Sequence, residues 1–173
     1  MGTCFSSSYD QSKFEPYTFE LTPEFSLKDQ ELVARVVDIY DGDTITVVLN
    51  IFNKFFKFTT RLSGIDTCEM KSKENANKEL AYKARNRLVQ LITSTIPGIE
   101  IPRSEIRRIL NNKVYLIKIK CGQFDKYGRL LGEIYVKNES LSLNQILINE
   151  KLAYSYDGKT KYTEEVQVSM MRI

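Results

Sequence analysis

The sequence predicts an α+β domain in which about three helices pack on a five-stranded OB-type β-barrel. Two observations lead to this fold class: runs of alternating apolar residues rich in β-branched and aromatic side chains, and their order along the chain. Three strands, a long helix, two more strands and a second helix are expected, an order that suits a small barrel with packed helices. The chain has 173 residues, enough for one such domain, which we place at residues 31–173.

Residues 1–30 form a leader of different composition. They are rich in Ser, Thr, Phe and Tyr, have no sustained periodicity and are interrupted by Pro16 and Pro23. Such a segment is expected to be flexible and mostly extended.

Alternating apolar residues predict three successive strands, beginning near Val33, at Ile45–Leu49 and at Phe55–Ile65. Asp41-Gly42 is a typical tight turn between the first two strands. The first three strands are therefore expected to form a meander.

The clearest helix is expected at Lys73–Thr95, where apolar residues recur every fourth position. Ser72 is suited to cap its first turn, and Pro97-Gly98 ends the run.

The basic segment Ile96–Asn112 connects this helix to two further strands, at Val114–Lys120 and Leu130–Val136. A second helix is expected at Leu143–Leu152, and a third, short helix from Thr163 to the C-terminus.

The segment 103–120, which includes the fourth expected strand, contains six basic residues and one acidic residue, Glu105. The basic residues are Arg103, Arg107, Arg108, Lys113, Lys118 and Lys120. Such a face attracts polyanions, but an ordinary solvated surface explains it equally well.

Composition removes several classes of function. The chain contains no histidine, so a Ser-His-Asp triad, a Cys-His pair and a His-ligated zinc site are all excluded. Three widely spaced cysteines suggest reduced thiols inside a cell. No apolar run approaches the roughly 20 residues that span a bilayer, and no signal-peptide pattern is present.

Three short motifs carry the chemistry: DGDT at Asp41–Thr44, RLSGIDTCE at Arg61–Glu69 and DKYGR at Asp125–Arg129. Asp43 follows a turn and Asp66 ends a strand, so a barrel could bring the two carboxylates together. They would then repel each other unless a cation or a proton lay between them. Without histidine or a CxxC pair, the ligands would be oxygens, which points to Ca²⁺ or Mg²⁺. Taken alone, DGDT is equally well explained as a hairpin turn.

The arginines and the third acid suit phosphoryl chemistry. Arg61 and Arg129 could bind phosphate oxygens through bidentate, permanently charged hydrogen bonds. Glu69 could orient or deprotonate an attacking water. Each arginine alone is more often a surface residue, so the argument depends on the combination.

Together these motifs resemble the staphylococcal nuclease family, from about Glu31 to Met171. The resemblance implies Ca²⁺ as cofactor, two arginines that clamp the scissile phosphate and a glutamate as general base. Carried over by motif, the implied ligands are Asp43, Asp66 and the Thr67 carbonyl with Asp41 in the outer shell, and the implied catalytic residues are Arg61, Glu69 and Arg129.

The resemblance further implies a monomeric, Ca²⁺-dependent endonuclease that cuts single-stranded DNA and RNA to 5′-hydroxyl and 3′-phosphate ends. Tyr127, Tyr154 and Tyr156 are candidates for stacking on bases, although packing roles are at least as common for such residues. The alternative is a non-catalytic nucleic-acid or protein-binding module of the same family, but such repeats typically lose the acids and arginines that this chain retains.

The chain departs from the family pattern at two positions. Cys68 stands where a proline usually stiffens the turn before the glutamate, and Lys151 stands where a glycine commonly ends a helix. If the backbone at Lys151 is left-handed, its cost is roughly 1 kcal/mol.

The first six residues, MGTCFS, match the pattern for N-myristoylation at Gly2, with Cys4 placed for palmitoylation. Two acyl chains give stable anchoring where one does not. In a eukaryotic host we therefore expect an intracellular, membrane-associated protein, and otherwise a cytoplasmic one.

Overall fold

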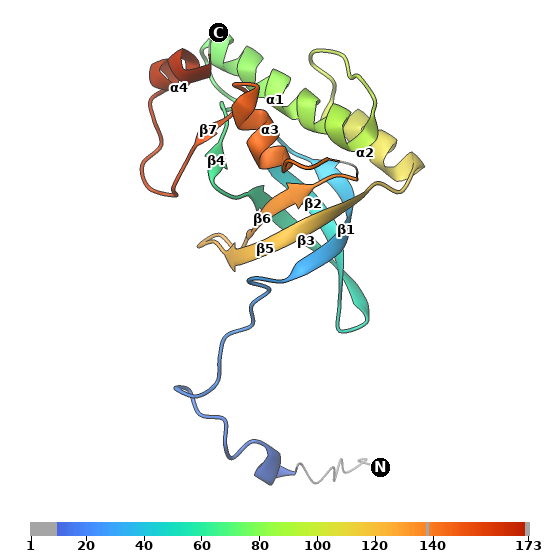
Figure 1. Cartoon of the computed structure of the whole chain (residues 1–173), viewed down its shortest axis with the longest axis vertical. Coiled ribbons are helices and arrows are strands. Elements are labelled where there is room, and N and C mark those ends of the chain that lie inside the picture. The colour runs from blue at the N-terminus through green and yellow to red at the C-terminus, as the bar shows by residue number, and fades with distance from the viewer. Residues whose placement is uncertain (1–9, 138, 172–173) are drawn as a thin grey trace, which may run out of the picture.

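The computed structural model describes residues 10–137 and 139–171. Five strands close into a barrel in the order β1 (Glu31–Ile39), β2 (Thr44–Ile51), β3 (Lys54–Leu62), β6 (Leu130–Tyr135) and β5 (Leu116–Phe124) (Figure 1). Neighbouring strands are antiparallel except β3 and β6, which run parallel. Alternate residues such as Val36, Val47 and Ile119 are fully buried inside. The predicted five-stranded barrel is confirmed.

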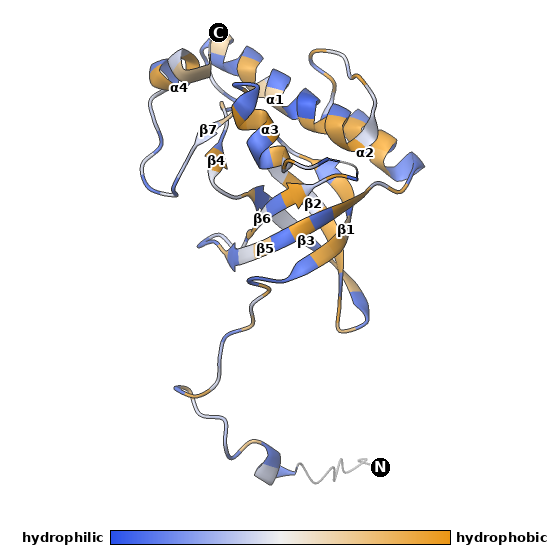
Figure 2. Cartoon of the chain, viewed as in Figure 1, coloured by the Kyte–Doolittle hydropathy of each residue, from blue (hydrophilic) through white to orange (hydrophobic). Residues whose placement is uncertain are grey.

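Four α-helices lie in the described part of the chain: α1 (Asn75–Thr93), α2 (Arg103–Asn112), α3 (Leu143–Asn149) and α4 (Glu164–Met171). The long helix α1 contacts α3, α4 and β1, while α2 packs on β1. Figure 2 shows that hydrophobic and hydrophilic residues alternate along α1, as expected for a helix with one buried side. None of the helices in residues 10–137 and 139–171 is long and apolar enough to cross a bilayer.

Helix α2 was not predicted, because the run of charges around it conceals a short apolar stripe. Ile106 and Leu110 lie one turn apart and are fully buried, whereas the intervening arginines point outward. Pro102 precedes the first turn and Glu105 lies within it, which are both common at helix N-termini.

The basic surface around α2 is largely neutralised within the molecule. Arg103 and Arg107 bind the carboxylate of Asp38, and Arg108 binds Glu105. This pairing favours the solvated-surface interpretation over a polyanion-binding face.

The expected strand Phe55–Ile65 is interrupted. Strand β3 ends at Leu62, and the chain turns through Gly64, whose φ of 75° suits glycine. It then forms the short strand β4 (Ile65–Asp66), which pairs with β7 (Tyr154–Ser155) in a separate two-stranded sheet. This break positions Asp66 beside the barrel.

The start of α1 differs from the prediction that Ser72 caps it. The helix begins two residues later, with Glu74 at the N-cap and no side-chain hydrogen bond there. The Ser72 hydroxyl instead accepts a hydrogen bond from the Glu74 N–H (3.0 Å), so it stabilises the turn that precedes the helix.

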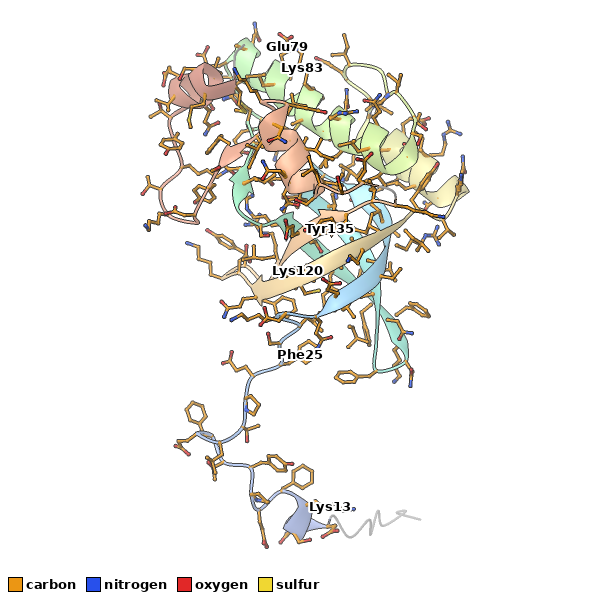
Figure 3. All side chains as sticks on the ribbon, in the orientation of Figure 1. Lys13, Phe25, Glu79, Lys83, Lys120 and Tyr135 are labelled. Atoms are coloured by element: carbon orange, nitrogen blue, oxygen red, sulfur yellow. The ribbon has the colours of Figure 1, made fainter. Side chains whose placement is uncertain are left out.

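The leader contains one turn of 3₁₀-helix, η1 (Gln11–Lys13), and then reaches the barrel through irregular chain with turns at residues 14–16, 19–21 and 28–29 (Figure 1). Leu27 is buried in the core, and the Phe25 ring lies 6.4 Å from that of Phe124 on β5. Figure 3 shows Phe25 where the leader reaches the barrel.

Candidate active site

The turn between β1 and β2 places Asp43 next to β3. Its N–H donates to Asp41 Oδ1 at 3.1 Å. Gly42 is required by close packing, since a Cβ there would lie 2.6 Å from that of Ala84 on α1 and 2.9 Å from the Thr67 side chain. Gly42 does not have the positive φ that a type I′ turn requires, so the motif joins antiparallel β1 and β2 through a turn of another type.

Arg61 on β3 joins two carboxylates. In the β2–β3 ladder it lies opposite Thr44, which follows Asp43 directly. Its Nη1 lies 2.7 Å from Asp43 Oδ2, and its Nη2 lies 2.5 Å from Asp66 Oδ1. The guanidinium of Arg61 therefore holds together two acids that are far apart in the sequence.

Asp66 is fully buried, and β7 supplies a partner for it. In the β4–β7 pair Asp66 lies opposite Tyr154, whose hydroxyl donates a hydrogen bond to Asp66 Oδ2. The Tyr154 side chain is only 3% exposed, so its ring has no free face for a base. For Tyr154 the packing role therefore holds, and the stacking role does not.

The pKa values of the two aspartates move in opposite directions. Burial, and next the negative charge of Asp41, raise the pKa of Asp43 well above its usual value, although Arg61 acts against this. Burial also acts to raise the pKa of Asp66, but hydrogen bonds from Tyr154 and Arg61 outweigh it and lower that pKa. The Arg61 guanidinium thus offsets only part of the negative charge at this site.

Glu69 lies at the edge of the same site with a half-exposed carboxylate. Its N–H donates to the buried Asn77 Oδ1 on α1 (3.0 Å), which fixes the backbone. The ammonium of Lys161, from the loop between β7 and α4, lies 2.6 Å from Glu69 Oε1 and 3.1 Å from Asp66 Oδ1. Lys161 therefore bridges the buried acid and the exposed one.

Arg129 follows the turn between β5 and β6. Asp125 Oδ1 accepts hydrogen bonds from the N–H groups of Tyr127 and Arg129, both at 2.9 Å, and Gly128 has a φ of 76°. Asp125 Oδ2 lies 2.7 Å from Arg129 Nε. The turn thus fixes both the backbone and the side chain of Arg129.

These segments surround one cavity of about 990 Å³. Asp43, Arg61, Glu69 and Arg129 all line it, and Asp66 lies behind them, fully buried. The structure therefore brings together the acids and arginines of the three motifs.

The remaining predicted residues occupy different depths of the cavity. Asp41 and Thr67 line it, and Thr67 is nearly fully buried. Tyr127 is 73% exposed at its rim, and half-buried Tyr156 lies with its ring 5.8 Å from the Arg61 guanidinium carbon. Tyr127 and Tyr156 are thus open to the cavity, whereas Tyr154 is not.

The chemistry of the donors suits a hard cation. The buried groups are the carboxylates of Asp43 and Asp66 and the adjoining Thr67, with no imidazole or thiolate among them. Burial and the nearby Asp66 raise the pKa of the Cys68 thiol to about 12, so it remains protonated. Among residues 10–137 and 139–171, no three His, Cys, Asp or Glu side chains are clustered so as to hold a metal ion alone. A cation here would need the Thr67 carbonyl or water as further ligands.

Lys161, Asn77 and the hydroxyl of Tyr154 were not recognised in the sequence. Lys161 lies in a polar loop with other lysines, where nothing distinguishes it. Asn77 lies on a predicted helix face, and a buried polar residue on such a face is the only available signal. Gly2 and Cys4 lie outside the described residues.

An OB-type barrel with a buried acid pair held by one arginine defines the structural class of this protein. Over residues 59–171 the chain matches the family of staphylococcal nuclease homologues. This span includes Arg61, Asp66, Glu69 and Arg129 but begins after Asp43. The chain belongs to this family, as the sequence motifs predicted.

Two relatives from Bacillus subtilis (strain 168) are similar to the chain. The endonuclease YncB is 28% identical over 167 residues, which make up 94% of this chain and 66% of that protein. The SPbeta prophage-derived endonuclease YokF is 30% identical over 140 residues, 79% of this chain and 40% of that protein. The chain thus spans less than two thirds of the length of either relative.

Proposed function

We propose that this chain is a Ca²⁺-dependent nuclease that hydrolyses phosphodiester bonds of single-stranded DNA and RNA, leaving 5′-hydroxyl and 3′-phosphate ends. The observation that supports this best is the convergence of Asp43, Arg61, Glu69 and Arg129 on one cavity. These residues come from three motifs that are separate in the sequence. Two relatives named as endonucleases support the nuclease part of this proposal.

The acid pair fits a divalent cation. Asp43 and Asp66 share the single guanidinium of Arg61, and burial, followed by the negative charge of Asp41, raises the pKa of Asp43. The two carboxylates and the Thr67 carbonyl would hold Ca²⁺, with Asp41 in the outer shell. When bound, Ca²⁺ would supply positive charge beside the phosphate.

The arginines would bind the scissile phosphate. Arg61 reaches the cavity from β3 and Arg129 from the turn before β6, and their N–H groups can donate to the non-bridging oxygens as negative charge builds there. Asp125 and Asp43 hold these guanidinium groups in advance, so little reorganisation is required.

Glu69 would accept a proton from the water that attacks phosphorus. Its carboxylate is half-exposed in the cavity, within reach of both a substrate and solvent. The new bond forms between the water oxygen and phosphorus, the bond to the 5′-oxygen breaks, and that oxygen leaves as a hydroxyl after taking up a proton. Tyr127 and Tyr156 would stack on the neighbouring bases.

Cleavage of labelled single-stranded DNA in Ca²⁺ or in EGTA tests this proposal. We expect Ca²⁺-dependent cleavage by the wild type and a loss of roughly 10²–10⁴-fold for Glu69→Gln. Glu79→Gln, on the outer face of α1, is the control and should cut normally. DNA binding without cleavage by the wild type would instead support the non-catalytic module.

We also propose that the protein is an intracellular monomer which, in a eukaryotic host, is attached to membranes by a myristoyl group on Gly2 and a palmitoyl group on Cys4. The acylation is supported by the MGTCFS pattern alone. Gly2→Ala should then move the protein from the membrane fraction to the soluble fraction, and an unchanged distribution would reject the proposal.

A further inference from the structure

The hairpin that joins β2 and β3 ends in exposed aromatic rings. Phe52 is 81% exposed and Phe55 74% exposed, and Phe56 is also exposed. The Phe25 ring of the leader lies 5.9 Å from that of Phe52 and is itself exposed. We call Phe25, Phe52, Phe55 and Phe56, with Lys54 and Lys57, the aromatic tip.

Phe52 occupies its position at a conformational cost. Phe52 and Asn53 form the turn, with φ values of 54° and 61°. Hairpin turns with two positive φ values favour Asn and Gly, and a bulky residue there is strained. The Phe52 ring meets only that of Phe25 among the ring contacts of the described residues, so a strained and exposed aromatic residue here points to a further contact outside the chain.

The charge of the β2–β3 hairpin has one sign, although Glu24 adjoins Phe25 in the leader. No acidic residue occurs between Asp43 and Asp66, and the charged side chains of the turn itself are Lys54 and Lys57, both exposed. Phenylalanines interleaved with lysines suit the boundary between lipid headgroups and acyl chains, where rings are buried and ammonium groups remain at the anionic surface.

We propose that the aromatic tip is a docking surface for an anionic lipid membrane. The exposed rings belong to the end of a hairpin and do not line the site cavity, so they can insert into a lipid surface without obstructing the site. A platform that stacks bases would instead place its rings in a groove beside the phosphate-binding residues.

The leader extends this surface. It leaves the barrel at Phe25 and runs away from α1 and α4, on the same side as the hairpin (Figure 1). Phe14, Tyr17 and Phe19, all largely exposed, add further aromatic rings along it. The leader also carries Asp10, Glu15, Glu20 and Glu24, so the attraction to anionic lipid comes from the lysines of the hairpin and not from the leader.

Sedimentation with vesicles tests the proposal on the full chain made without acylation. We expect binding to vesicles of mixed phosphatidylcholine and phosphatidylserine, weaker binding to phosphatidylcholine alone, and at least a tenfold weaker partition for Phe52→Asn combined with Phe55→Ser. Asn suits the left-handed turn position, so Phe52→Asn alone should melt no lower than the wild type. Lys54→Gln with Lys57→Gln should remove the preference for phosphatidylserine.

The matched control is Ile96→Ser with Ile99→Ser, which removes two equally exposed apolar side chains from the loop between α1 and α2. It should bind vesicles like the wild type. Equal vesicle binding by the wild type and the tip variant would overturn the proposal. So would a tip variant that loses affinity for single-stranded DNA instead, or one that converts a dimer into a monomer in sedimentation velocity.

Discussion

Two clusters in this protein both consist of aspartates and arginines, but they differ in the ratio of carboxylates to guanidinium groups. Asp38 on β1 accepts hydrogen bonds from Arg103 and Arg107 on α2, so one carboxylate meets two guanidinium groups. In the cavity the ratio is reversed, because Asp43 and Asp66 share Arg61. The first cluster fastens a helix to the barrel, and the second retains negative charge next to an opening.

The difference appears in the pKa values. Burial would raise the pKa of Asp38, but hydrogen bonds from Arg103 and Arg107 more than offset it and lower that pKa. Burial and Asp41 raise the pKa of Asp43, and Arg61 does not offset them. A carboxylate with two cationic partners has its negative charge balanced within the chain. A carboxylate with too few cationic partners can bind a further cation.

Arg61→Lys tests this contrast with the largest expected effect. Lysine cannot span two carboxylates and bind phosphate bidentately, so we expect the rate of DNA cleavage to fall by roughly 10²–10³. Arg103→Lys, in the other cluster, should cut at close to the wild-type rate. Initial rates on single-stranded DNA at saturating Ca²⁺ measure both, and equal losses in the two variants would contradict the division of roles.

The two aspartates should respond to neutralisation with opposite signs. In EGTA at neutral pH, Asp38→Asn should lower the free energy of unfolding by about 1–3 kcal/mol, because it removes hydrogen bonds to charged groups. Asp43→Asn should raise Tm by roughly 2–4 °C, because the fold already favours the uncharged form of this residue. Thermal unfolding followed by circular dichroism measures both changes.

The contributions of Asp38 and Asp43 to stability depend on pH in opposite directions. Asp38 has a lowered pKa, so its stabilisation is present above its unfolded pKa of about 3.9 and is lost as the pH falls through the folded value. Asp43 has a raised pKa, so the wild type recovers stability as the pH falls through that value, and the advantage of Asp43→Asn disappears. A stability difference independent of pH would show that neither effect is electrostatic.

A smaller effect is expected for Lys161, which adds positive charge next to the acids of the cavity. Its ammonium contacts Asp66 and Glu69, so it competes for the negative charge that a cation would use. Lys161→Met should raise the affinity for Ca²⁺ severalfold, measured by titration calorimetry without substrate. Lys159→Met is the control, because Lys159 pairs with Asp157 instead. Unchanged affinity in both variants would mean that Lys161 does not compete.

The sequence was sufficient to predict the barrel, because alternation along each strand directly encodes which face is buried. It also identified Asp43, Arg61, Asp66, Glu69 and Arg129 by their motifs, all of which the structure places around the cavity or directly behind it.

What the sequence did not reveal depends on contacts between distant segments. The pairing of β4 with β7, two residues each, is too short for any periodic signal, yet it places Tyr154 on Asp66. Lys161 reaches the site only because its loop folds back over Glu69. Helix α2 was concealed because its charged face has the more obvious pattern.

Lys151→Gly has the smallest effect that we predict. It gives a stability change caused by the backbone alone, with which the changes in the Asp38 and Asp43 variants can be compared. Lys151 has a φ of 55° just beyond α3, where the Leu152 N–H bonds back to the Leu147 carbonyl (2.8 Å). Such a helix end favours glycine, because a side chain is strained in the left-handed region. We expect about 1 kcal/mol of added stability, or a rise in Tm of roughly 2–4 °C, and no change in DNA cleavage. Lys137→Gly, at an exposed position after β6, is the control and should not stabilise the fold. If Lys151→Gly destabilises the protein, the Lys151 side chain stabilises the fold by more than its left-handed backbone conformation destabilises it.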